Sequence, residues 1–148
     1  MNPSDVIRLL GWLHPMLVHF PVALILTACV AEALYVAKKD SYFAAAALFL
    51  ATAAAWMSLP AFAVGFAAAA GETFTPEFSG AFAAHRIAGI TTPMLAFIAA
   101  GMGHSTRRSG EVWEQAVYRT FLVLAAVSVA VAGFYGGKLV HGPGHLPL

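Results

Sequence analysis

Residues 15–37 read PMLVHFPVALILTACVAEALYVA, a long apolar run in which Glu32 is the one acidic residue. About 20 predominantly apolar residues are enough for a helix to cross the hydrocarbon core of a bilayer, so this run predicts a transmembrane helix. It has neither the basic leader nor the small-residue cleavage site of a secretory signal. We therefore expect the run to be kept in the mature protein.

Three similar apolar runs follow, at about 42–70, 82–103 and 116–140. They lack the alternation of polar and apolar residues that barrel strands show, and in lipid a helix satisfies its own backbone polar groups. Short connections make successive helices antiparallel neighbours. The sequence therefore predicts an all-α fold, with a single integral membrane domain over residues 1–148. In this domain an antiparallel four-helix transmembrane bundle follows a short interfacial helix capped by Ser4.

The composition excludes a nucleic-acid-binding protein and a disulfide-rich scaffold. Of the 148 residues, 60% are hydrophobic and 10% are charged, and the net charge is +1. No stretch gathers lysine and arginine with interleaved aromatic residues, so we expect no nucleic acid partner. The single cysteine, Cys29, has no second cysteine with which to form a disulfide or a thiolate metal cluster. This composition fits a protein that is surrounded by membrane lipid.

Charge is distributed unevenly over the predicted connections, which are residues 38–40, 71–80 and 105–114. The first and third connections each contain a pair of adjacent basic residues, whereas the middle one contains two glutamates and no basic residue. The positive-inside rule places the first and third connections in the cytoplasm. Both termini and the acidic connection then lie on the periplasmic side.

Four of the six histidines fall at the periplasmic ends of the predicted spans. His14 and His19 lie at the start of the first span, His85 at the start of the third and His141 at the end of the fourth. Alternating helix directions bring these positions to one face of the membrane. Ionisable residues in a span are costly to bury and by default indicate a functional site. His14 and His19 lie about 140° apart around a helix and about 7.5 Å apart along it, so we expect them to face different neighbours.

Residues close to these histidines would suit a large planar cofactor. Arg86 could bind a carboxylate such as a haem propionate through its forked guanidinium, or could reach the lipid headgroups. The glycines in this region remove side-chain bulk, which fits either a flat cofactor or tight helix packing. They are Gly89, Gly133, Gly136 and Gly137.

Simpler roles compete with a cofactor site. A lone histidine near a helix end is more often an interfacial or hydrogen-bonded residue than a ligand. His104 and His145 are expected to be solvated, with no role in a site. Glu32 lies toward the cytoplasmic end of its span, where we expect an ion pair with Arg119 to hold the helices together.

Three motifs resemble those of a known family. They are His-Pro-x-x-Val-His-Phe-Pro at 14–21, His-Arg-x-x-Gly at 85–89, and Gly-Gly-x-Leu-Val-His-Gly at 136–142. Together they resemble the bacterial membrane proteins called domain of unknown function family 2231, over nearly the whole chain. The resemblance implies a bacterial inner-membrane protein with the four-helix topology and this histidine set. Relatives are sometimes joined to redox domains, so it also implies electron transfer by association.

The leading hypothesis is a membrane cytochrome of b type. One or two haem b groups would be bound non-covalently through His14, His19, His85 and His141, with Arg86 beside them. No C-x-x-C-H motif is present, which excludes covalent attachment. Electrons would pass to or from a membrane quinol or a periplasmic redox protein, and a homodimer is one further option.

Two alternatives stay open at this point. The same histidines could bind copper or zinc, since imidazole suits both metals. The chain could instead be an accessory subunit without a cofactor, whose alanine-rich faces contact a partner. No nucleophile–base arrangement or carboxylate pair accompanies the histidines, so an electron carrier is favoured over an enzyme.

Overall fold

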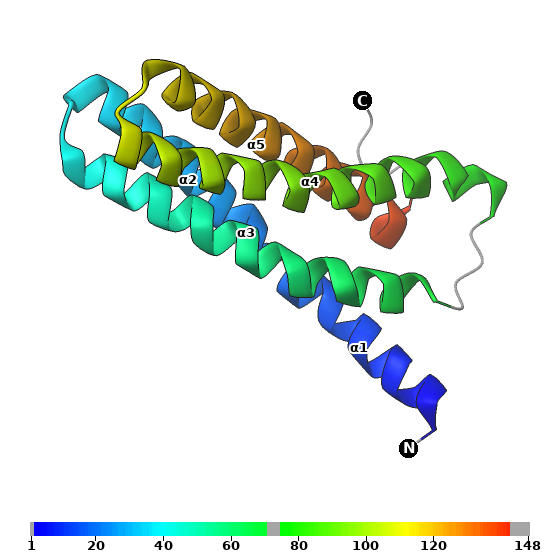
Figure 1. Ribbon diagram of the computed structural model, residues 1–148. Coiled ribbons are helices and arrows are strands. Elements are labelled where there is room, and N and C mark those ends of the chain that lie inside the picture. Colours follow the sequence, from blue (N-terminus) through cyan, green and yellow to red (C-terminus); the bar gives the residue numbers. More distant parts are fainter. Residues whose placement is uncertain (1, 71–74, 143–148) are drawn as a thin grey trace.

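The described residues, 2–70 and 75–142 in a computed structural model, form a long bundle of α-helices without a strand. Figure 1 shows that α2 with α3, and α4 with α5, form two hairpins whose tight turns lie at the same end of the molecule. Within this part of the chain, four helical stretches are long and apolar enough to cross a membrane, with α1 and α2 counted as one. The predicted all-α four-helix bundle is confirmed. The helices are α1 (Pro3–Leu17), α2 (His19–Lys38), α3 (Ser41–Ala69), α4 (Pro76–Ser109) and α5 (Val112–His141).

The N-terminal helix begins at Pro3, one residue earlier than the predicted cap. The capping residue is Asn2 rather than Ser4, and the carboxylate of Asp5 accepts a hydrogen bond of 3.2 Å from the Asn2 backbone N–H. Proline suits the first helical position because its missing N–H would have no partner there.

A helix does precede the first span as the sequence predicts, but α1 is longer than expected, reaching Leu17, and it joins α2 without a loop (Figure 1). Val18, between the two, keeps helical angles of φ −65° and ψ −23°. The interruption follows from Pro21, which has no N–H to donate to the carbonyl of Leu17. Both helices therefore belong to one candidate span over Ser4–Lys38.

The two hairpin turns are shorter than the sequence predicts. Lys39 ends α2 in the left-handed conformation with φ 58°, and Asp40 then caps α3 by accepting the Tyr42 N–H at 2.9 Å. Gly110 ends α4 in the same conformation with φ 72°, where a glycine has no steric penalty. The connection predicted at 105–114 is thus reduced to two residues, because polar sequence beyond the apolar run continues the helix. We call this the turn end of the bundle.

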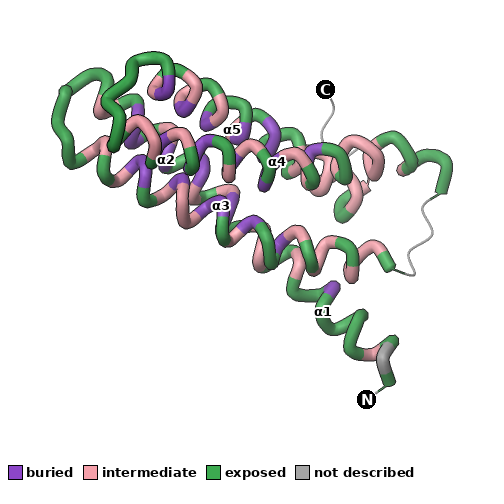
Figure 2. The backbone as a smooth tube through the Cα atoms, in the orientation of Figure 1, coloured by how far each residue is buried: buried purple, intermediate pink, exposed green. Residues whose placement is uncertain are grey.

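Alanine makes most of the core and lets the helices approach closely. Buried alanines from all four long helices pack in contiguous clusters together with Ile25, Tyr118, Leu122 and Val129. In Figure 2 the buried positions follow the inner faces from the turn end to the middle of the bundle and become sparse along α1. Small residues permit close backbone contact between membrane helices, where apolar burial alone gives no preference for helix over lipid.

A cluster of hydroxyl groups joins α4 to α5 near the middle of the bundle. The Ser128 hydroxyl lies 2.9 Å from those of Thr91 and Thr92 and bonds the Ala88 carbonyl at 3.1 Å. Such interhelical hydrogen bonds contribute about 0.6 kcal/mol each on average in membrane proteins. The cluster fixes the register of the second hairpin.

We predict opposite effects of alanine at two glycines of α4. A Cβ at Gly103 would lie 2.7 Å from Leu48 Cδ1 and 3.1 Å from the Tyr118 ring, whereas one at Gly101 would meet nothing within 4 Å. Gly103→Ala should lower the free energy of unfolding by about 1–3 kcal/mol through overpacking. Gly101→Ala should raise it by about 0.5–1 kcal/mol through helix propensity. Unfolding in detergent measures both, and equal stabilities would contradict the close contact at Gly103.

Candidate functional site

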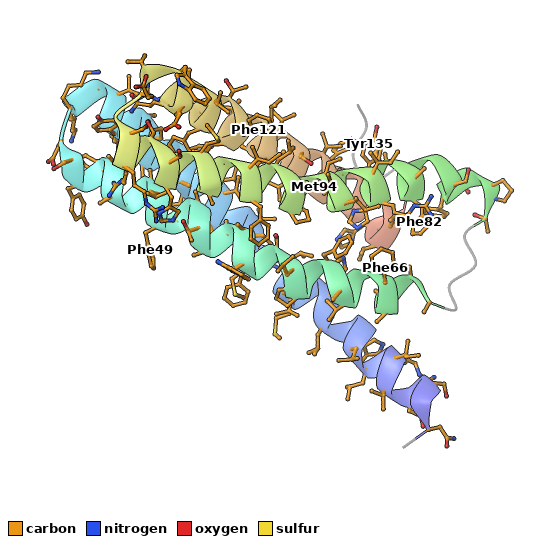
Figure 3. The ribbon with its side chains drawn as sticks, in the orientation of Figure 1. Phe49, Phe66, Phe82, Met94, Phe121 and Tyr135 are labelled. Carbon is orange, nitrogen blue, oxygen red and sulfur yellow. The ribbon has the colours of Figure 1, made fainter. Side chains whose placement is uncertain are left out.

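Two histidines meet at the end of the bundle opposite the turns, one from α1, which leads into the first hairpin, and one from the second hairpin. The rings of His14 on α1 and His85 on α4 lie with their centroids 6.1 Å apart and their planes at 86°. Phe66, next in sequence after Gly65, and Phe82, one turn before His85, mark this region in Figure 3. We call it the histidine end, and the two imidazoles the histidine pair.

Each imidazole of the pair is oriented by a backbone carbonyl of the neighbouring helix. His14 Nδ1 lies 3.1 Å from the carbonyl oxygen of Ala61, and His85 Nδ1 lies 2.8 Å from that of Ala132. A carbonyl oxygen only accepts, so Nδ1 is the donor in both rings, and the neutral imidazole keeps a lone pair on Nε2. Metal-binding histidines commonly have this arrangement, in which one nitrogen donates to a carbonyl and the other binds the metal.

A glycine makes room for each ring of the pair. A Cβ at Gly65 would lie 3.1 Å from His14 Cε1, and a Cβ at Gly136 would lie 3.1 Å from His85 Cε1 and Nδ1. Both glycines lie one turn beyond the residue whose carbonyl accepts the hydrogen bond. Each imidazole is therefore seated against bare backbone, which restricts its rotation.

The other two predicted ligands have different surroundings. His19 is exposed, and its Nδ1 bonds the carbonyl of Pro15 on the preceding turn. This agrees with the prediction that His14 and His19 face different neighbours. His141 is the last residue of α5 and is exposed. The structure thus brings His14 and His85 into ring contact and gives His19 a bond within its own chain segment.

Arg86 is exposed next to the histidine pair, with its guanidinium carbon 5.6 Å from the centroid of the Phe82 ring. An arginine that stacks on an aromatic ring uses the flat face of its guanidinium, so the N–H donors at the edge of the guanidinium can still bind an anion. Of the four nearby glycines, Gly136 packs tightly against His85, but a Cβ at Gly89, Gly133 or Gly137 would meet nothing within 4 Å. Close packing therefore explains Gly136 and not the other three.

The remaining histidines differ in how far the structure describes them. His104 was expected to be solvated; it is exposed, but its Nε2 lies 3.0 Å from the hydroxyl of Thr52. That hydroxyl donates to the carbonyl of Leu48, so His104 Nε2 is the donor. His104 thus links α4 to α3. His145 lies outside the described residues.

The predicted ion pair of Glu32 and Arg119 is confirmed, with Arg119 Nε 2.8 Å from Glu32 Oε1. Glu32 is only 7% exposed, whereas the Arg119 side chain is 37% exposed, so the pair joins α2 to α5 with its carboxylate buried and its guanidinium near the surface. It borders a cavity of about 500 Å³ near the turn end, which Tyr118 also lines. The buried Tyr118 hydroxyl has no hydrogen-bond partner among the described residues. No sequence motif marks this tyrosine, which lies in an apolar run.

Fold and site together define a helical membrane protein with a pair of carbonyl-oriented histidines between two hairpins. The family described as "Predicted membrane protein (DUF2231)" matches residues 12–144, and the chain belongs to this family. The resemblance of the three histidine and glycine motifs is thereby confirmed. No curated protein and no solved structure matches the chain.

We predict the tautomers of three histidines. In neutral protein, ¹⁵N NMR of the side chains should show protonated Nδ1 for His14 and His85, because each donates to a carbonyl. His104 serves as the internal control and should show protonated Nε2, since it donates to Thr52. A protonated Nε2 on His14 or His85 would contradict the arrangement described for the pair.

Proposed function

We propose that this protein is a membrane-embedded b-type cytochrome, in which His14 and His85 bind the iron of one haem b. The observation that carries the proposal is the pair itself: two imidazoles from different helices, 6.1 Å apart, with both Nδ1 atoms engaged by carbonyls. Axial ligation by histidines on facing helices is an established use of a helix bundle.

The separation of the rings favours ligands on opposite sides of one metal. Two imidazoles bonded to a metal at about 2 Å have centroids roughly 6 Å apart when the bonds are collinear, and roughly 5 Å apart when they meet at the tetrahedral angle. The observed separation is 6.1 Å, close to the collinear value. Two opposite ligands are what haem iron takes.

The number of protein ligands points the same way. Among the described residues, no three His, Cys, Asp or Glu side chains gather closely enough to hold a metal ion. A structural zinc site uses four protein ligands, whereas a porphyrin supplies the four equatorial nitrogens of its own iron. The histidine pair therefore suits haem better than zinc.

The surroundings of the pair fit a wide, flat, anionic ligand. The absence of any contact near a Cβ at Gly89 or Gly133 leaves space on α4 and α5 beside His85. Arg86 follows His85 directly and can bind a propionate through its fork of donors. His14 and His85 would hold the iron, and their bonds to Ala61 and Ala132 would fix the ring planes before the haem arrives.

Haem b would supply reversible one-electron transfer. The basic pairs at 38–39 and 107–108 favour a cytoplasmic turn end, which assigns both termini and the histidine end to the periplasmic side of a bacterial inner membrane. A site there would exchange electrons with a membrane quinol or a periplasmic redox protein. The role is that of a carrier. In the alternative with two haems, His19 and His141 would supply the further ligands.

The redox difference spectrum of the purified protein in detergent tests this proposal. Dithionite should produce the absorption bands of a reduced low-spin haem b. His14→Ala and His85→Ala should each lose at least nine-tenths of these bands, because each removes an axial ligand. His104→Ala is the matched control and should keep them.

The other outcomes separate the alternatives. A colourless preparation that contains copper or zinc would favour the metal-binding protein, and one with neither would favour the accessory subunit. Loss of haem in His19→Ala, with retention in His14→Ala, would replace the pair proposed here by another set of ligands.

The perpendicular rings predict the magnetic properties of the oxidised protein. Imidazole planes at 86° make two of the iron d orbitals nearly equal in energy. The ferric protein should therefore give a strongly anisotropic low-spin EPR signal with a very large maximum g value. An ordinary rhombic low-spin signal would indicate nearly parallel rings and would contradict the geometry of the pair.

A further inference from the structure

The two hairpins repeat each other at a fixed distance along the chain. Helix α2 ends at Lys38 and α4 at Ser109, a separation of 71 residues. The left-handed caps that follow, Lys39 and Gly110, have the same separation. Helices α3 and α5 start at Ser41 and Val112, again 71 residues apart. The cap hydrogen bonds to the carbonyls of Tyr35 and Thr106 keep this spacing too.

The histidine pair obeys the same spacing. His14 and His85 are 71 residues apart, and each bonds the carbonyl of the residue 47 positions later, Ala61 in one case and Ala132 in the other. The glycines against the two rings, Gly65 and Gly136, are also 71 residues apart. The histidine, the alanine that accepts its hydrogen bond and the glycine against its ring are therefore the same residue types in both halves.

Burial repeats in the same register along both helices of the hairpin. Ile25, Ala28 and Glu32 of α2 are buried, and so are the residues 71 positions later on α4. On α3, four of the seven buried residues likewise correspond to buried residues of α5. The matched pairs are Pro21 with Thr92, Ile25 with Ala96, Ala28 with Ala99, Glu32 with Gly103, Ala47 with Tyr118, Ala51 with Leu122, Ala54 with Ala125 and Ser58 with Val129.

The contacts between hairpins are reciprocal. Helix α3 of the first packs against α4 of the second, and α5 of the second packs against α2 of the first. Exchange of the two halves turns one contact into the other, as a two-fold rotation does. Since α2 and α4 run in the same direction, this rotation axis runs along the bundle. His14 and His85 meet across it.

We infer that the chain is a structural duplication of a 71-residue helical hairpin, and that the histidine pair is a single composite site on its local two-fold axis. Each half supplies one imidazole, one orienting carbonyl and one glycine. Such a site would bind one ligand that has two equivalent faces. A planar metal macrocycle, whose metal accepts one axial ligand on each face, is a ligand of this kind. The ligand class rests on the proposed function, whereas the equivalence of the halves rests on the geometry alone.

The composite site distinguishes the pair from the other histidines. His19 corresponds to Ile90, 71 residues later, whereas His104 and His141 correspond to Ala33 and Ala70, 71 residues earlier. None of these three histidines has a counterpart that could act as the second ligand of an equivalent site. The halves also differ at Val18, where the helix is interrupted, while α4 continues through the corresponding Gly89. The expected stoichiometry is therefore one macrocycle per chain.

Titration of the full-length apoprotein in detergent with haemin tests the composite site. Binding should saturate at one haemin per chain. Gly65→Ala and Gly136→Ala crowd equivalent rings at 3.1 Å, so each should raise the Kd by about tenfold, and by factors that agree within about threefold. Gly101→Ala is the control: its Cβ would meet nothing within 4 Å, and the residue lies on α4 well beyond His85, so the Kd should stay unchanged.

Saturation at two haemins per chain, or a large effect of one glycine variant without the other, would overturn the composite site. If haemin binds to none of the proteins, the proposed function fails, and the equivalence is then decided without it. In that case Gly65→Ala should shift the ¹⁵N resonances of His14, and Gly136→Ala those of His85, by similar amounts. A shift at one ring alone would overturn the duplication itself.

Discussion

The close approach of the two helices within each hairpin is the constraint on which this structure depends. An imidazole can reach a backbone carbonyl of the next helix only where that helix presents little more than backbone, and Gly65 and Gly136 provide this. A helical carbonyl already accepts one hydrogen bond, but its second lone pair can accept the Nδ1–H of a histidine. In an apolar environment this bond satisfies a polar ring that would otherwise be costly to bury.

The same constraint connects the fold to the proposed function. A histidine held through Nδ1 presents Nε2 in a fixed direction, so little ordering would be needed when a metal binds. Two such rings that meet from the two halves of the chain would couple ligand binding to the packing of one half on the other. Haem in this position would stabilise the folded protein by mass action, because an unfolded chain cannot hold both ligands in place.

The two ends of the bundle are built differently. The turn end has short capped turns, an internal ion pair between Glu32 and Arg119, and an alanine-rich core. The histidine end is less buried, and α1 packs there mainly against α3, where a Cβ at Gly11 would lie 2.9 Å from the Ala68 backbone. A well-packed end and a more open end would suit the proposed binding of a large ligand to the folded bundle.

Much of the fold could be predicted from sequence, because apolar runs long enough to cross a bilayer leave the helix as the way to satisfy the backbone. The pairing of Glu32 with Arg119 was also predictable, since an isolated charge in a span needs a partner. Helix ends were harder to predict. The apolar run ends at about residue 103, but α4 continues to Ser109, because polar residues beyond an apolar run can still be helical. Cap positions such as Asn2 depend on local hydrogen bonds rather than on hydropathy.

The sequence by itself determined that four helices alternate in direction and that histidines gather toward one end. Only the tertiary structure decided that His14 and His85 meet, that carbonyls of Ala61 and Ala132 orient them, and that the two hairpins are equivalent. The physical reason is that an apolar run predicts a helix in the membrane but, in lipid, says little about how that helix is rotated about its own axis. Contacts among small side chains and glycine backbone set this rotation. Because the helices contain many alanines, the sequence does not show which of them make these contacts.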